Sequence, residues 1–304
     1  MQKNKSGIWK YILPFILLMF VILLGKGNIV SHFSQSEQQL NVFVSILPQK
    51  YFVEKISGDR VKVSVMVGPG QNPATYEPLP KQMAALAEAD LYFRIGVPFE
   101  TVWIKQIQSL NPQLKIVDTR EGITLRNIEG PHNHEANSLL ENKEVKDPHI
   151  WLDPLLVKIQ AETICRELSA GDLENKDFYE QNLREFQADL DQLHRELTET
   201  FQGLSVKKIM VFHPSWGYLT DRYGLKQIPI EVEGKEPGPQ ELAQAIDLAK
   251  QEGIKVIFVQ TQFDTRAAES AARAVGGKVV GLDPLAEDYM NNLRKIAAVI
   301  KKEL

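Results

Sequence analysis

Hydrophobic residues along this chain of 304 residues fall into short runs that alternate with longer amphipathic stretches. Short β-rich runs followed by helical patterns are typical of βαβ units and of a parallel sheet. In the first part of the chain the predicted elements are 42–47, 49–57, 61–67, 80–89, 91–94, 100–109 and 115–117. In the last part they are 208–212, 216–223, 227–230, 239–252, 256–259, 264–274, 278–282 and 288–302. The pattern therefore predicts two α/β lobes.

A long uninterrupted helical pattern lies between the two predicted lobes. Over residues 177–202 apolar side chains recur at alternating spacings of four and three, which places them in one stripe on a helix. The stripe consists of Tyr179, Leu183, Phe186, Leu190, Leu193 and Leu197. An ordinary core helix has the same pattern, but a helix of roughly 39 Å is long enough to connect two lobes. We therefore predict an N-terminal lobe at 40–175, a linker helix at 176–203 and a C-terminal lobe at 204–304.

The first 30 residues differ from the rest of the chain. Lys3, Lys5 and Lys10 precede the apolar run 11–24, and a basic segment followed by an apolar one is typical of an export signal. The run is shorter than the roughly 20 residues that span a bilayer. However, no Ala-x-Ala site or lipid-accepting cysteine follows it. We interpret residues 1–30 as a signal peptide or an uncleaved membrane anchor, and expect a periplasmic or otherwise extracytoplasmic protein.

The charge balance and the cysteine content exclude two classes of function. When the four lysines of the N-terminal segment are left out, 31 of the 35 basic residues and 39 acidic residues remain, which gives a formal charge of −8. Such an acidic body argues against a nucleic-acid partner. Cys165 is the only cysteine and lies in a predicted helix, where a small buried hydrophobic residue is the usual role. No catalytic thiol is indicated.

Two histidines and one aspartate follow predicted strands or turns. His149 stands between two Asp-Pro pairs ahead of an amphipathic helix, His213 follows the run 209–212, and Asp283 follows 279–282. Ligands of open parallel sheets bind beyond the carboxyl ends of the strands. Two imidazoles and a carboxylate at this edge would form a three-point site for a divalent cation. Taken singly, they could instead cap a turn, bond in the core or cap a helix.

The other histidines carry weaker signals. His132 and His134 lie in the polar, breaker-rich loop 130–138, which is either a solvated loop or a segment that captures metal for the main site. His194 lies beside the apolar stripe of the linker helix, and His32 lies near the export signal. We interpret His194 and His32 as structural or solvated.

Several motifs also carry a family resemblance. They are SILPQKYFVE at 45–54, MVGPG at 66–70, YEP at 76–78, DPHIWLDP at 147–154 and GKEP at 234–237. In their order and density they resemble the zinc and manganese solute-binding proteins of ABC transporters. The match runs from about residue 42 to the C-terminus.

The resemblance implies a fold and a ligand set. The fold is two pseudo-symmetric α/β lobes with parallel sheets, joined by one long helix, and four protein groups hold the metal in the cleft. His149, His213 and Asp283 match three of these groups. Ala74 stands where the family usually has a histidine, so the site uses three ligands and water or recruits Glu77. In an extended loop, Glu77 would face away from the direction of Ala74.

The resemblance and the donor set together predict the function. A histidine at the position of His213 gives a nitrogen-rich site suited to Zn²⁺, whereas a carboxylate there would favour Mn²⁺. We expect the protein to capture zinc, with manganese or iron as the alternative, and to deliver it to an ABC transporter permease in the membrane. We expect a monomer that performs no chemistry.

Two other functions use the same residues. Three protein ligands with an open water position form the pattern of a zinc hydrolase, but the chain has no His-Glu-x-x-His helix or other hydrolase signature. A two-lobed protein with one spanning helix could also hold chelated iron or a corrinoid. His149, His213 and Asp283 argue against a site that has lost its metal.

Overall fold

The structure, a computed structural model, describes residues 39–129, 145–231, 236–262 and 264–304. These residues belong to one compact unit, Gln39–Leu304. The predicted export signal and the loop with His132 and His134 lie outside the described residues. In the described part, none of the helices has both the length and the apolar composition of a membrane span.

The first lobe contains a four-stranded parallel sheet with the order β2-β1-β3-β4. Its strands are β1 (Leu40–Ile46), β2 (Val61–Val67), β3 (Leu91–Arg94) and β4 (Lys115–Asp118). Its helices are α2 (Leu47–Ser57), α3 (Pro80–Leu86), α4 (Pro98–Leu110) and α5 (Pro154–Gly171). The 3₁₀ turns η1 (Ile150–Leu152) and η2 (Leu173–Asn175) flank α5.

The second lobe repeats this topology with the order β6-β5-β7-β8, again all parallel. Its strands are β5 (Lys208–Val211), β6 (Lys226–Pro229), β7 (Val256–Gln260) and β8 (Lys278–Leu282). Its helices are α7 (Gly217–Arg222), α8 (Pro239–Gln251), α9 (Arg266–Ala274) and α10 (Tyr289–Glu303). The predicted fold class, two α/β lobes with parallel sheets, is confirmed.

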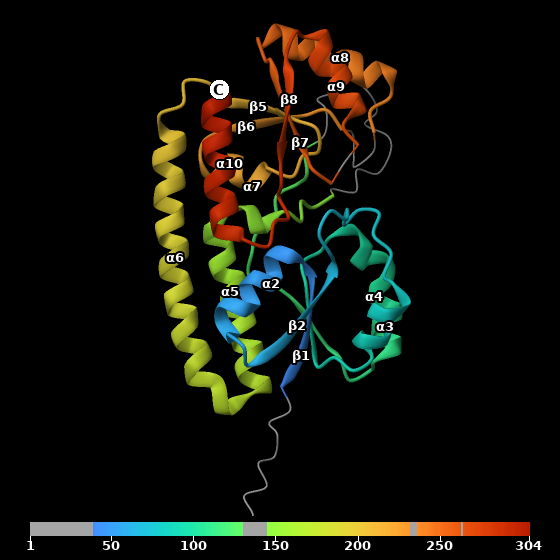
Figure 1. Cartoon of the computed structure of the whole chain (residues 1–304), viewed down its shortest axis with the longest axis vertical. Helices are drawn as coiled ribbons and strands as arrows, with labels where there is room; N and C mark the ends of the chain where they lie inside the picture. The colour runs from blue at the N-terminus through green and yellow to red at the C-terminus, as the bar shows by residue number, and fades with distance from the viewer. Residues whose placement is uncertain (1–38, 130–144, 232–235, 263) are drawn as a thin grey trace, which may run out of the picture. The chain divides into compact units, whose positions relative to one another are not determined.

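The long helix α6 (Lys176–Gln202) contacts both lobes. It packs against α2 and α5 of the first lobe and against α10 of the second, and Figure 1 shows it running beside all three. Its buried residues are Tyr179, Phe186, Leu190, Leu193, Leu197 and Phe201. The predicted stripe is therefore the buried face, except that Leu183 is only partly buried and Phe201 extends the stripe.

Local sequence explains where the elements begin and end. Helices α2, α3, α4, α5 and α8 each have a proline in the first turn, where its missing N–H is not needed and its fixed φ suits a helix. Pro98 therefore starts α4 two residues before the predicted start. Helix α3 is three residues shorter than the predicted 80–89, because Glu88 and Ala89 form turn-like hydrogen bonds to Ala85 and Leu86.

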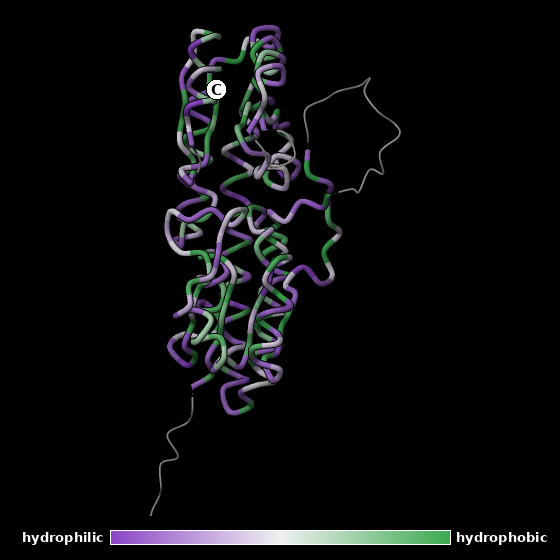
Figure 2. The backbone as a smooth tube through the Cα atoms, turned by 90° about the vertical axis from the view of Figure 1, so that its right-hand side faces the viewer, coloured by the Kyte–Doolittle hydropathy of each residue, from purple (hydrophilic) through white to green (hydrophobic). Residues whose placement is uncertain are grey.

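Two hydrophobic cores lie on the two faces of the second sheet. Ile209 and Val211 of β5 belong to the main core, whereas Met210 and Phe212 belong to a smaller core with α8 and α9. This is the two-residue alternation of a strand covered on both faces. Figure 2 shows hydrophobic and hydrophilic residues alternating along the backbone. The main core continues through α6 and α10 into the first lobe, so the lobes share one core.

Replacing Leu190 of α6 by alanine tests the importance of this shared core. Leu190 is fully buried, so we expect Leu190→Ala to lower the free energy of unfolding by about 2–5 kcal/mol. Guanidinium titration followed by circular dichroism measures it. Glu199→Ala, at an exposed position of the same helix, is the control and should change stability by no more than about 0.5 kcal/mol. Equal effects of the two substitutions would contradict the shared core.

Candidate metal-binding site

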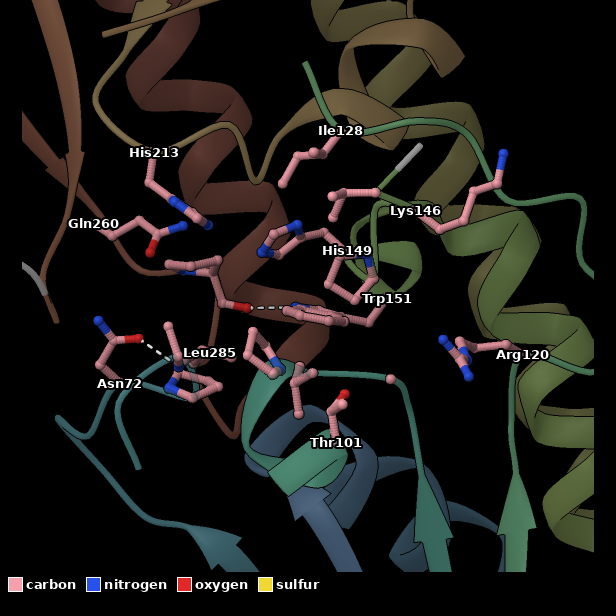
Figure 3. A pocket seen from close by; sticks show the side chains of 18 of the residues that line it. Asn72, Thr101, Arg120, Ile128, Lys146, His149, Trp151, His213, Gln260 and Leu285 are labelled. Atoms are coloured by element: carbon pink, nitrogen blue, oxygen red, sulfur yellow. Dashed lines mark hydrogen bonds between the residues drawn. The ribbon is translucent and has the colours of Figure 1, made fainter. Parts of the chain in front are cut away.

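A cavity of about 620 Å³ lies at the carboxyl ends of strands from both lobes. Topology predicts a ligand site at this edge of each sheet. Its walls come from the loops after β2, β3, β4, β5 and β8, from the end of β7 and from the segment around η1. Side chains central to the site are Ala74, Arg120, His149, Trp151, His213, Gln260 and Leu285. Figure 3 shows them from close by.

The local sequence Asp147-Pro148-His149 fixes the orientation of His149. The Asp147 carboxylate accepts hydrogen bonds from the His149 backbone N–H (2.9 Å) and from ring Nδ1 (2.7 Å). After the turn η1, Asp153 caps α5 by accepting a hydrogen bond from the Leu155 N–H (2.9 Å). His149 is 8% exposed and lines the cavity. The two Asp-Pro pairs therefore hold the histidine from both sides.

His213 lies two residues after the end of β5 and is oriented by a carboxylate in the same way. Its ring Nδ1 bonds the carboxylate of Glu231, a buried residue that follows β6. The centroids of the His149 and His213 rings are 5.3 Å apart, and the rings point toward one another (Figure 3). A carboxylate can only accept, so Nδ1 donates and Nε2 is the nitrogen that each neutral ring presents to a ligand. The structure brings together two of the predicted metal ligands.

Burial keeps the His149 ring neutral. Desolvation lowers the pKa of His149 because it disfavours the imidazolium, and the nearby Asp147 carboxylate opposes this shift only in part. A metal binds the neutral form of imidazole, so the pKa shift favours metal binding at neutral pH.

The other two predicted ligands, Asp283 and Glu77, do not line the cavity. Asp283 Oδ1 accepts hydrogen bonds from the Leu285 N–H (2.9 Å) and from Gln262 Nε2 (2.6 Å), and the side chain of Glu77 is exposed. Asp283 is not a helix cap either, because α10 has Asp288 at its N-cap. In the described part of the chain, no three His, Cys, Asp or Glu side chains lie close enough together to hold a metal. Both residues remain predicted ligands.

Ala74 lies in the cavity wall beside Asn72 and Pro73. Asn72 Oδ1 accepts a hydrogen bond from the Ala74 N–H (2.9 Å), which holds the loop after β2 in a turn. The methyl group of Ala74 supplies no donor atom. The loop after β2 therefore lines the same cavity as the two histidines without contributing a side-chain ligand at position 74.

Sequence reasoning missed the two carboxylates that orient the histidines. Asp147 stands two residues before His149, but its Asp-Pro pair indicated only a turn. Glu231 follows the strand β6 as His213 follows β5, and parallel pairing of these strands places their ends together. An acidic residue after the neighbouring strand was the available signal.

Residues of the second lobe hold the His149 segment in place. Tyr218 of α7 donates a hydrogen bond to the Asp147 carbonyl (3.0 Å), and Trp151 Nε1 donates to the Pro284 carbonyl (2.8 Å). Arg222 Nε donates to the Asp153 carboxylate (2.8 Å). The distance between His149 and His213 is therefore set by direct bonds between lobes. His194, interpreted as structural, shares a hydrogen bond with the Tyr223 hydroxyl (3.2 Å).

Comparisons with a family model and with individual proteins agree on one family. The family model described as "Zinc-uptake complex component A periplasmic" matches residues 42–303. The high-affinity zinc uptake system protein ZnuA of Bacillus subtilis is 28% identical, over 94% of this chain and 90% of that protein. The manganese ABC transporter substrate-binding lipoprotein PsaA of Streptococcus mitis is also 28% identical, over 85% of this chain and 84% of that protein.

Solved structures agree with this fold. A crystal structure of ZnuA is 46% identical, covers 87% of this chain and 98% of its own, and superposes with a TM-score of 0.80. A zinc-bound deletion mutant of ZnuA gives 46% identity and a TM-score of 0.79, covering 87% of this chain and 97% of its own. The laminin-binding protein Lmb of Streptococcus agalactiae, described as an adhesin with metal-transporting activity, is 26% identical with a TM-score of 0.76. The match covers 88% of this chain and 99% of Lmb.

The lowered pKa of His149 predicts a pH dependence of stability. The folded protein binds a proton at His149 less readily than the unfolded chain, whose histidines titrate near pH 6.5. The resulting stability is fully present above about pH 6.5 and is lost as the pH falls through the folded pKa. We expect the melting temperature of the metal-free protein to fall more between pH 7.5 and 5.5 than that of His149→Gln. Parallel pH profiles would show that burial of His149 has no such effect.

Proposed function

Because the chain belongs to the family of periplasmic zinc-uptake components, we propose that it captures zinc outside the cytoplasm and delivers it to an ABC transporter permease. The family is one of solute-binding proteins of metal transporters and not of enzymes. We further propose that residues 1–30 direct export, as a signal peptide or an anchor, and that the exported protein acts as a monomer. The bound ion is cargo, to be released and not retained.

The pair His149 and His213 is the observation that carries this proposal. Two imidazoles from two lobes lie 5.3 Å apart at one cavity, each oriented by a buried carboxylate. Carboxylate–histidine pairs of this kind are a common feature of metal sites, because they fix the ring and raise its basicity. A core histidine that needed only a hydrogen bond would not require a second imidazole beside it.

The donor set supports zinc over manganese. Imidazole suits zinc, whereas carboxylate, carbonyl and water suit manganese. A zinc-bound ZnuA at 46% identity supports zinc, and the PsaA relative, named for manganese, keeps manganese as the alternative cargo. We propose Asp283 as a third ligand that exchanges its hydrogen bond with Gln262 for the metal when zinc enters.

Substituting the two histidines tests the site. We expect His149→Gln and His213→Gln each to weaken zinc binding by at least about 100-fold. Loss of a residue that only hydrogen-bonds a metal ligand typically costs roughly 10–100-fold, and loss of the ligand itself should cost at least as much. Isothermal titration of the exported domain with zinc and with manganese measures both affinities. We expect zinc to bind more tightly than manganese in the unchanged protein. His194→Gln is the control and should bind zinc normally, because His194 lies on α6, bonds the Tyr223 hydroxyl and does not line the cavity.

Retention of full zinc affinity in the double variant His149→Gln/His213→Gln would overturn the proposal. Tighter binding of manganese than zinc would overturn only the assignment of the ion. The two results are separable because the same titrations report both.

The carboxylates behind the histidines provide an independent test. We expect Asp147→Asn and Glu231→Gln each to weaken zinc binding by about 10–100-fold, because an amide accepts a weaker hydrogen bond from Nδ1 and stabilises the bound imidazole less. Calorimetry of each variant gives the affinity, and circular dichroism checks the fold. If both amide variants bound zinc as tightly as the unchanged protein, the carboxylates would have no role in the site.

A further inference from the structure

The cavity beside His149 and His213 is far larger than an ion requires. Its volume is about 620 Å³, whereas a water molecule takes about 30 Å³ of liquid volume. Sites for small organic molecules measure roughly 300–1,000 Å³. The cavity therefore has the size of a site for an organic molecule and an ion together.

Much of the cavity wall is apolar. Pro73, Val97, Trp151 and Leu285 line it, and so do Val102 and Val145. The last two are 74% and 58% exposed, unusual for large hydrophobic side chains. A hydrated metal ion gains nothing from an apolar wall, whereas the carbon atoms of an organic molecule do. The apolar wall, like the volume of the cavity, therefore suits a small organic molecule.

A cationic group lies at the same cavity. Arg120 donates from Nε and Nη2 to Asp118 (2.8 and 2.6 Å), and its Nη1 has no hydrogen-bond acceptor among the described residues. Gly96, with φ +89°, leaves room for this guanidinium, because a Cβ there would lie 2.1 Å from Nη1. In the described part of the lining, Arg120 and Lys146 carry charge and no Asp or Glu is present. This wall suits an anion.

The position of Arg120 relative to the histidines indicates how such a ligand would lie. Figure 3 shows His213 and Gln260 at one side of the cavity, Arg120 and Lys146 at the other, and His149 and Trp151 between them. Ala74 lines the same cavity as the two histidines and supplies no donor atom. A molecule that carries both a metal donor and a carboxylate would satisfy both ends of the cavity.

We propose that the protein captures its divalent ion as a complex with a small carboxylate-bearing chelator, which fills the position left by Ala74 and pairs its carboxylate with Arg120. This inference rests on the proposed metal-binding function of the same site. His149 and His213 remain protein ligands, and the chelator supplies at least one further donor atom. The apolar wall covers the carbon skeleton of the chelator.

Equilibrium dialysis with radiolabelled probes tests the proposal. The exported domain is dialysed against labelled zinc alone and against zinc with labelled L-histidine, citrate or iminodiacetate. We expect the protein to retain at least one of these chelators in a ratio of one per zinc, only when zinc is present. We also expect that chelator to tighten zinc binding at least about tenfold at equal free zinc.

Two variants locate the chelator. Ala74→His restores a protein donor at an exposed position, so we expect tighter binding of zinc alone and reduced retention of the chelator. Arg120→Gln should abolish most of the gain from the chelator, measured as the ratio of the zinc affinities of the same variant with and without the chelator. Arg266→Gln is the matched control, because Arg266 pairs with Asp264 as Arg120 pairs with Asp118 but lies outside the cavity lining.

The outcomes separate this inference from the function on which it rests. If the domain retains zinc tightly by itself and no labelled chelator stays with it, the chelate proposal is wrong and the zinc-binding function stands. If it retains zinc neither alone nor with any chelator, the proposed function itself fails. Retention of the labelled chelators without zinc would also overturn the chelate proposal.

Discussion

The hydrophobic core shared by the two lobes is the constraint on which the site depends. It runs from the first sheet through α6 and α10 to the inner face of β5, so the lobes cannot separate without exposing it. Interiors packed to crystal-like density deform little, which restricts the lobes to small relative motions. Trp151 connects the two lobes directly, because its ring is buried in this core and its Nε1 donates a hydrogen bond to the Pro284 carbonyl of the other lobe. The separation of His149 and His213 is therefore set by packing before any metal arrives.

Within that frame, buried charge orients the two imidazoles. The Asp147 carboxylate is fully buried, a costly position unless its oxygens are paired. The His149 backbone N–H, the His149 ring and Arg126 Nη1 (3.3 Å) all bond it. Arg126 also pairs with Asp221 of α7 (3.0 Å), so the network extends across the lobes. Each of these bonds restricts the ring, and a fixed ring loses less entropy when it binds a metal.

Periodicity and strand order made much of this architecture predictable, whereas the site was predictable only in part. The βα alternation, the stripe on α6 and the placement of His213 after β5 depend on local sequence and on the general topology of parallel sheets. Asp147 and Glu231 were missed as partners because their roles depend on side-chain rotamers. Asp283 is not a lining residue, and its carboxylate instead accepts hydrogen bonds from Leu285 and Gln262, which no pattern in the sequence indicates. The volume of the cavity arises from several loops of both lobes together, and no single segment encodes it.

The alanine at position 74 changes how such a site can select its metal. Affinities of nitrogen and oxygen sites for first-row divalent ions follow a common order, so proteins select among these ions by geometry and ligand type. A site with four protein ligands fixes both the coordination geometry and the types of ligand. Here His149 and His213 line the cavity, Ala74 supplies no donor atom, and Asp283, the proposed third ligand, is not part of the lining. If the proposed chelator completes the coordination sphere, selection depends on that group, and a wall with Arg120 at one end favours an anionic one. On this proposal the cavity and the histidines together determine the identity of the cargo.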